Sequence, residues 1–224
     1  MYRKILFDLD GTLTDPKEGI CKSVQYALSA FGIEEPDIEK LTPFIGPPLK
    51  NSFMEFYGLS EEQAVAAVEK YRERFSVTGL YENEVYAGIP QMLANLQEKG
   101  YRLAIASSKP TIYVKRILEH FLLDSYFDVI MGSELDGRRV NKDEVIREAL
   151  AELFLGEPVC HAQVVMVGDR KFDVEGAKAL GMDCVGVEYG YADSGELQEA
   201  GASYVVSTVA ELEKLLLSLY EAGK

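Results

Sequence analysis

Two aspartates that end an apolar run near the start of the chain constrain this sequence more than any other feature. The run Lys4-Ile5-Leu6-Phe7 leads into Asp8-Leu9-Asp10-Gly11-Thr12-Leu13-Thr14. Such a run predicts a strand buried on both faces, as in a parallel sheet. Open α/β sheets bind their ligands at the carboxyl ends of the strands, so both carboxylates are expected at that edge. Glycine gives the backbone freedom to turn directly after the pair.

Metal-assisted attack by a carboxylate is the chemistry that this pair favours. A carboxylate is a hard oxygen ligand for Mg²⁺, and it can also act as a nucleophile that forms an acyl-phosphate. Asp-x-Asp pairs also occur in solvated turns and strand caps, which is the alternative interpretation of Asp8 and Asp10. The complete string of buried strand, paired aspartates, glycine and threonines is more specific than the pair alone.

Composition excludes several classes of protein. The 224 residues carry a formal net charge of −14, which argues against nucleic acid or an anionic membrane as the main partner. No apolar run approaches the roughly 20 residues of a membrane span, and no signal peptide is evident. Cys21, Cys160 and Cys184 are odd in number and lack metal-ligand spacing, which predicts reduced thiols in a cytoplasmic protein.

The pattern predicts an α/β protein built from a doubly wound parallel sheet with a small all-helical insert. Residues 16–84 show helical spacing, with a capping box expected at Ser60 and Gln63 and several prolines before it. Residues 1–15 and 85–224 are expected to form the sheet domain, because strand and helix patterns alternate there. Strands are expected over 101–106, 127–131, 163–167, 183–187 and 203–206. Helices are expected over 89–98, 172–180 and the leucine-rich end, with others through 114–121 and from Asn141 or Lys142.

Polar side chains at three predicted strand ends are expected to converge. Asp8 and Asp10 follow the first strand, Ser107 and Ser108 another, and Asp169 a third. A serine hydroxyl there can bind a phosphate oxygen, helped by free N–H groups if Pro110 lies in the first helical turn, and a simple helix cap is the alternative.

Two further charged residues have open interpretations. Lys142 could reach the site and neutralise phosphate as a point charge, but spacing alone does not separate it from Arg138, Arg139 and Lys171. Asp173 could support a metal or the lysine, or it could only complement the dipole of its helix.

With these motifs in place, the sequence resembles the haloacid dehalogenase superfamily over nearly the whole chain. Asp8-Leu9-Asp10-Gly11-Thr12 looks like its first motif, Ser107 its second, Lys142 its third, and Gly168-Asp169 with Asp173 its fourth. Motif two is often threonine, asparagine and lysine, and Ser107-Ser108-Lys109 keeps the hydroxyl donor. The insert is similar to the helical cap of phosphoglycolate phosphatases, and Phe44-Ile45-Gly46-Pro47-Pro48-Leu49 resembles a 5'-nucleotidase-like bacterial subgroup.

The resemblance implies a mechanism and a set of site residues. Asp8 would attack phosphorus and form an aspartyl-phosphate, and Asp10 would protonate the leaving alcohol and then deprotonate water. Ser107, Ser108 and Lys142 would hold the phosphoryl oxygens. Mg²⁺ would be bound by the carboxylates of Asp8 and Asp169 and by the backbone carbonyl of Asp10, with Asp173 in support.

The expected activity is hydrolysis of small phosphate monoesters, with phosphoglycolate or a nucleoside 5'-monophosphate as the substrate. The partner would be a small phosphorylated metabolite, and the chain would be a monomer or a small homo-oligomer. A phosphosugar mutase resembling β-phosphoglucomutase is the alternative on the same core. A protein that keeps the fold and binds without turnover is the alternative from another class.

Overall fold

The computed structural model describes residues 2–221, and these divide into two compact units. One unit contains the described residues up to Thr14 and those from Val85 onward, and the other contains Asp15–Glu84. The helical insert and the sheet domain are each described by themselves below.

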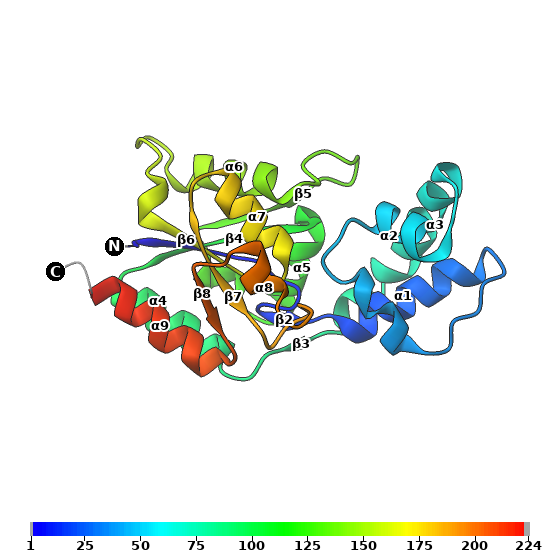
Figure 1. Ribbon diagram of the computed structural model, residues 1–224, viewed down its shortest axis with the longest axis horizontal. Coiled ribbons are helices and arrows are strands. Elements are labelled where there is room, and N and C mark those ends of the chain that lie inside the picture. Colours follow the sequence, from blue (N-terminus) through cyan, green and yellow to red (C-terminus); the bar gives the residue numbers. More distant parts are fainter. Residues whose placement is uncertain (1, 222–224) are drawn as a thin grey trace. The chain divides into compact units, whose positions relative to one another are not determined.

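The sheet domain is built on a six-stranded parallel sheet in the order β5-β4-β1-β6-β7-β8 (Figure 1). The strands are β1 (Lys4–Phe7), β4 (Arg102–Pro110), β5 (Val129–Ser133), β6 (Val164–Gly168), β7 (Asp183–Val187) and β8 (Tyr204–Val206). The chain places β4 and β5 on one side of β1 and then returns to place β6, β7 and β8 on the other side. This is the arrangement of a doubly wound sheet, and it confirms the predicted fold class.

Helices cover both faces of this sheet, as parallel strands require. They are α4 (Ile89–Lys99), α5 (Thr111–His120), α6 (Lys142–Leu153), α7 (Lys171–Ala179), α8 (Glu196–Ala200) and α9 (Val209–Glu221), with short 3₁₀ helices η3 (Asp124–Tyr126) and η4 (His161–Gln163). Figure 1 shows α6 and α7 on one face and α4 and α9 on the other. Leu6 packs with the apolar residues of α6 and α7.

The register of the central strands places the predicted site at one edge. Phe7 pairs with Ile105 of β4 and with Val167 of β6, and it is fully buried. Asp8 therefore follows directly after a residue that is locked between two neighbouring strands, and its N–H donates to the carbonyl oxygen of Val167 at 2.9 Å. The carboxyl ends of β1, β4 and β6 lie side by side, as the sequence predicts.

Two of the predicted strands differ from the observed ones by two or more residues at an end. The strand expected to end at residue 106 continues to Pro110, with a register shift between Ser107 and Pro110, and Pro110 precedes α5 instead of lying in its first turn. The strand expected over 127–131 runs from Val129 to Ser133. Gly132 explains the extended pairing, because a Cβ there would lie 2.3 Å from the carbonyl oxygen of Lys109. Only glycine lets the irregular end of β4 approach β5 so closely.

The second unit is helical, with α1 (Lys17–Ser29), α2 (Leu49–Tyr57) and α3 (Glu61–Phe75), and with 3₁₀ helices η1 (Ile38–Phe44) and η2 (Gly79–Tyr81). The expected capping box at α3 is confirmed: the N–H of Gln63 donates to Oγ of Ser60 at 3.2 Å, and the N–H of Ser60 donates to Oε1 of Gln63 at 2.9 Å. The proline-rich stretch before it contains α2, which the sequence pattern did not predict. Phe44 packs edge-on against Phe53 in the buried interior of this unit.

The chain passes between the two units through two short strands. These are β2 (Thr14–Asp15) and β3 (Glu84–Val85), which form a two-stranded sheet of their own. Both connections of the helical insert are therefore hydrogen-bonded to each other.

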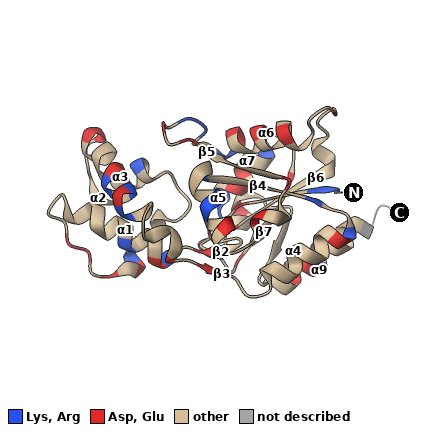
Figure 2. Cartoon of the chain, turned by 180° about the vertical axis from the view of Figure 1, so that it is seen from behind, with Lys and Arg blue, Asp and Glu red and all other residues tan. Residues whose placement is uncertain are grey.

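Acidic segments occur in both units (Figure 2), and the three cysteines are free thiols. Over residues 2–221, none of the helices combines the length and the apolar character that crossing a membrane demands.

Candidate active site

The loop that follows β1 is shaped by Gly11. This residue has φ +74°, and its N–H donates to the carbonyl oxygen of Thr14 at 2.8 Å, which folds the chain back on itself. A Cβ at Gly11 would lie 2.0 Å from Oδ2 of Asp169. The glycine of the motif is therefore required both for its left-handed backbone and for the space that it leaves to a carboxylate.

Of the four basic residues considered from the sequence, Lys142 enters the site. It is the first residue of α6, and its Nζ lies 3.0 Å from Oδ1 of Asp8 and 2.6 Å from Oδ1 of Asp173. Its side chain is 4% exposed. Burial opposes its charge, but the Asp173 and Asp8 carboxylates outweigh it and raise the pKa of Lys142 above its usual value.

The other basic candidates do not take this position. Arg138 is exposed and pairs with Asp136 at 2.8 Å, and Arg139 pairs with Glu134 and Glu148. The side chain of Lys171 is exposed on α7. The choice among lysines and arginines that spacing left open is thus resolved by contact geometry.

Three buried carboxylates gather at the same edge of the sheet. Asp8, Asp169 and Asp173 each offer an oxygen atom, and these oxygens all lie within 4.8 Å of one another. Burial is the main cause that raises the pKa of Asp169 well above its usual value, and the charges of Asp173 and Asp8 add to it. Burial likewise raises the pKa of Asp173 to about 6, against the opposing effect of Lys142. Close carboxylates of this kind are a site for a hard cation.

Asp10 lies in a different environment from this triad. Its Oδ2 is 2.7 Å from Nζ of Lys109, and both side chains are largely buried, at 11% and 6% exposure. Burial raises the pKa of Asp10, although Lys109 acts to lower it. An acid–base role requires a carboxyl group whose pKa is lifted toward neutrality, and this environment acts in that direction. The predicted metal contact of Asp10 is through its backbone carbonyl and stays a prediction.

The charges of the site leave room for a divalent cation. Four carboxyl groups (Asp8, Asp10, Asp169 and Asp173) face two ammonium groups (Lys109 and Lys142), so the site has an excess of two negative charges when all four are ionised. Within residues 2–221, Oδ1 of Asp169 is buried and accepts no hydrogen bond. Buried unpaired charge is costly, so the donor set fits Mg²⁺ in charge and in ligand type.

Ser107 and Ser108 lie in the irregular end of β4. Ser107 is 2% exposed, and its Oγ accepts a long hydrogen bond, 3.4 Å, from the N–H of Lys109. The carbonyl oxygen of Ser108 accepts a hydrogen bond from Oγ of Ser133 at 2.7 Å, which ties the segment to β5. Their predicted contacts with phosphate stay predictions.

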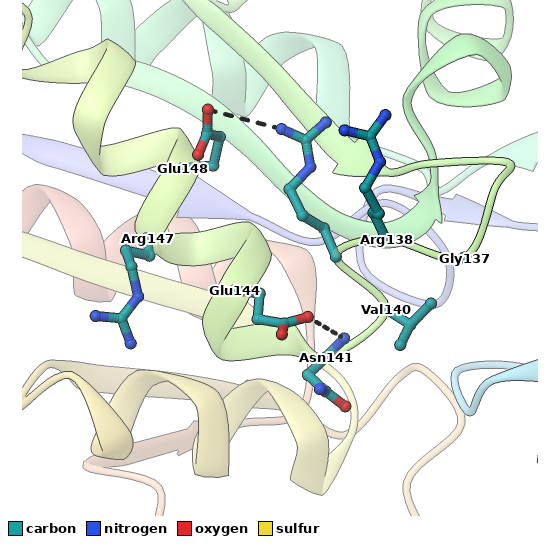
Figure 3. Close-up of a pocket in the computed structure, with 8 residues that line it drawn as sticks. Gly137, Arg138, Val140, Asn141, Glu144, Arg147 and Glu148 are labelled. Carbon is teal, nitrogen blue, oxygen red and sulfur yellow. Dashed lines mark hydrogen bonds and ion pairs between the residues drawn. The ribbon is translucent and has the colours of Figure 1, made fainter.

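A separate surface pocket of about 460 Å³ lies beside the start of α6 (Figure 3). It is lined by residues 137–141 and by Glu144, Arg147 and Glu148, and it contains none of the predicted site residues. Its arginines are paired with acids: Arg147 lies 3.8 Å from Asp143, and Arg139 lies 3.7 Å from Glu148. This pocket therefore carries little unbalanced positive charge.

Two groups at the site were not predicted from the sequence. Lys109 pairs with Asp10, and the segment Tyr189-Gly190-Tyr191 approaches Asp169 and the loop after β1. Lys109 follows a predicted strand end, which was a usable signal. The segment Tyr189-Gly190-Tyr191 follows β7 at the same edge of the sheet, but glycine and tyrosine there do not indicate a particular chemistry.

The parallel α/β sheet and the cluster of carboxylates and lysines at its edge fit a metal-dependent hydrolase, and residues 5–187 match the haloacid dehalogenase-like hydrolase family. The chain belongs to that family. Among curated proteins, the 5'-nucleotidase of Pseudomonas aeruginosa is 48% identical over 97% of this chain and 96% of its own length. Tyrosine-protein kinase PtkA of Mycobacterium tuberculosis is 39% identical over 95% of this chain and 72% of its own.

A third curated relative and one solved structure also match almost the whole chain. A phosphoglycolate phosphatase of Aquifex aeolicus is 30% identical, with 96% of each chain covered. The crystal structure of a predicted phosphatase from Clostridium acetobutylicum matches with a TM-score of 0.93 and 47% identity, over 97% of this chain and 99% of that one. The expected superfamily and the assignment to the phosphatase class of enzymes are thereby confirmed.

Proposed function

We propose that this protein is a Mg²⁺-dependent phosphatase that hydrolyses small phosphate monoesters through an aspartyl-phosphate. Phosphoglycolate and nucleoside 5'-monophosphates are the proposed substrates, in keeping with the names of two relatives. We further propose that it works in the cytoplasm on a small phosphorylated metabolite, without nucleic acid or membrane as a partner. The helical insert Asp15–Glu84 is proposed to act as the cap that selects the substrate.

The position of Asp8 carries this proposal. Its carboxylate contacts the ammonium of Lys142 on one side and belongs to the Asp8, Asp169 and Asp173 triad on the other. A phosphoryl group brought to this carboxylate would meet positive charge on both sides once a cation is bound. Phosphoryl transfer depends mainly on such positioning and charge neutralisation.

The roles of the side chains follow from their surroundings. Asp8 attacks phosphorus, and the leaving alcohol takes a proton from Asp10, whose raised pKa allows it to hold one. Asp10 then removes a proton from the water that hydrolyses the aspartyl-phosphate. Ser107, Ser108 and Lys142 hold phosphoryl oxygens, and Asp173 fixes Lys142. Asp8, Asp169 and the backbone carbonyl of Asp10 would hold the metal ion, which would supply charge neutralisation.

The test is phosphate release in the presence of Mg²⁺ across a panel of esters. The panel contains phosphoglycolate, nucleoside 5'-monophosphates, sugar phosphates and an aryl phosphate, with the Asp8→Asn protein as the blank. We expect release from one class well above the others, and none from Asp8→Asn while its circular dichroism spectrum stays native. Near-native rates in Asp8→Asn would overturn the assignment of the nucleophile.

Two other outcomes would replace the proposal. Isomerised phosphosugar with little free phosphate, dependent on a bisphosphate primer, would identify a mutase. No turnover of any ester, with Mg²⁺ still bound, would identify a binding protein that keeps the fold.

A further inference from the structure

The segment that leaves β7 makes three contacts with residues far away in the sequence. The hydroxyl of Tyr189 donates to the carbonyl oxygen of Thr12 at 2.9 Å. The N–H of Tyr191 donates to Oδ2 of Asp169 at 2.7 Å. Between them, Gly190 lies so close that a Cβ would be 2.4 Å from the Cβ of Asp169 and 2.4 Å from the carbonyl oxygen of Gly11. One short segment thus contacts both the loop after β1 and the acidic residue after β6.

The far end of this segment is fixed as well. The carboxylate of Glu196 accepts hydrogen bonds from Nε of Arg170 at 2.9 Å, from the N–H of Lys171 at 2.7 Å and from the N–H of Asp193 at 3.2 Å. Both side chains of the Arg170–Glu196 pair are largely buried, at 13% and 8% exposure. The N–H of Arg170 in turn donates to Oδ2 of Asp173 at 3.1 Å. Residues 189–196, which we name the strap, therefore contact the segments that carry both Asp169 and Asp173.

The two carboxylate oxygens of Asp169 have different surroundings, because only one of them accepts the hydrogen bond from Tyr191. Oδ2 is occupied by the strap, whereas Oδ1 is buried and accepts no hydrogen bond from residues 2–221. Gly190 and Gly11 both pack against the same carboxylate, so its rotation is sterically limited. A ligand oxygen held in one orientation, with its partner oxygen hydrogen-bonded, is the usual arrangement around a bound metal ion.

We propose that the strap is a positioning element for the metal site, in which Gly190 and the hydroxyl of Tyr189 hold Asp169 and the Gly11–Thr14 loop in the geometry that binds a divalent cation. This inference rests on the proposed function, because it takes Asp169 as a ligand. Tyr189 and Gly190 act through Asp169 and Thr12, and they are positioning residues.

The experiment measures Mg²⁺ binding to the metal-free protein by titration calorimetry, without substrate or turnover. Gly190→Ala inserts a methyl group against Asp169, and Tyr189→Phe removes only the hydroxyl that contacts Thr12. Outer-shell changes typically weaken metal binding about 10- to 100-fold. We expect a Kd increase in that range for Gly190→Ala and roughly 10-fold for Tyr189→Phe.

Two matched variants control for general effects on folding. Tyr101→Phe removes another buried hydroxyl that donates to a backbone carbonyl, that of Leu216 at 2.6 Å. Gly186→Ala adds a methyl group to β7 itself, where the neighbours are side-chain atoms of Leu197 at 3.0 Å or more. Both are expected to keep the Kd of the unmodified protein. Thermal unfolding of all four variants without Mg²⁺ separates a loss of folding from a loss of binding.

Each outcome has a defined meaning. Unchanged Mg²⁺ affinity in a folded Gly190→Ala or Tyr189→Phe protein overturns the role of the strap. Equal losses in the test variants and their controls also overturn it, since the effect would then be general. If the unmodified protein binds no Mg²⁺, the proposed function itself fails. If the unmodified protein binds Mg²⁺ and the test variants bind it more weakly, as expected, while no ester is hydrolysed, the proposed role of the strap is supported and the phosphatase proposal is overturned.

Discussion

Nζ of Lys109 lies 2.7 Å from Oδ2 of Asp10, and this contact joins the irregular end of β4 to the loop after β1. Burial and Lys109 act in opposite directions on the pKa of Asp10. The lysine orients the carboxylate at the same time as it offsets part of the cost of burying it. Its removal should therefore affect the acid–base step of the proposed reaction.

We expect Lys109→Met to lower kcat for an aryl phosphate about 10- to 100-fold, a part of the 10²- to 10⁴-fold that general acid–base catalysis supplies. KM should change little, because Asp8 and Lys142 keep their contact. Steady-state kinetics of Lys109→Met and of Lys171→Met, an exposed lysine on α7, provide the comparison. Equal kcat values in both variants would show that Lys109 has no part in the reaction.

Lys142→Met should destabilise the fold as well as abolish turnover. The ammonium is the shared partner of Asp8 and Asp173, and its removal leaves buried carboxylates without compensation. Breaking a buried pair by removing one partner costs about 3–5 kcal/mol. Urea unfolding measures this loss, and the Lys142→Met/Asp173→Asn double variant should recover part of it. A double variant less stable than Lys142→Met alone would contradict the account.

Mg²⁺ should stabilise the folded protein, because the site brings four carboxyl groups together with only two ammonium groups. A cation that binds only the folded state adds about 2.7 kcal/mol when its free concentration is roughly 100 times Kd. The thermal midpoint should rise with Mg²⁺ in the unmodified protein and in the surface variant Asp136→Asn. Asp169→Asn should lose this response and be more stable than the unmodified protein without metal, since burial opposes the charge of Asp169.

The loss of folding stability in acid should depend in part on Asp183, which lies outside the active site. Its two oxygens accept hydrogen bonds from the hydroxyls of Ser203 at 2.6 Å and Tyr2 at 2.5 Å, and these lower the pKa of Asp183 below its usual value. A pKa lowered by folding adds stability above the unfolded value, and that stability is lost as the pH falls through the folded value. Asp183→Asn should therefore be less stable than the unmodified protein near neutral pH and converge with it in acid. Urea unfolding from about pH 7 to about pH 3 tests this, and a constant difference across that range would refute it.

Local signals predicted much of the fold. The strand over Asp183–Val187 was predicted with its observed bounds, and Ser60 and Asn141 precede helices as capping residues should. Two helices, α2 and α8, were not predicted. The prolines before α2 favour a loop in the sequence pattern, and α8 spans only Glu196–Ala200, which leaves too few residues for a periodic pattern. The end of β4 was misplaced because its pairing depends on Gly132, a contact in another part of the chain.

The candidate site was predictable to the extent that strand ends converge. Asp8 and Asp169 meet as the topology predicts, Asp173 joins them from α7, and the roles assigned to all three stay proposals. The two interpretations of Asp173 are compatible, because it lies in the first turn of α7 and also contacts Lys142. The choice of Lys142 over other basic residues, and the contacts of Lys109 and Gly190, depend on distances of a few ångströms between separate elements. Sequence spacing does not contain those distances.

The pairing of β2 with β3 has an evolutionary consequence. The helical insert leaves and rejoins the sheet domain through two adjacent, hydrogen-bonded strands, so its two ends are already held together. A foreign segment with closely spaced ends could be grafted at the same pair without stretching the sheet. Recombination at the β2–β3 pair would then be a route by which relatives come to act on different substrates. The order and register of the strands in the six-stranded sheet would be inherited unchanged.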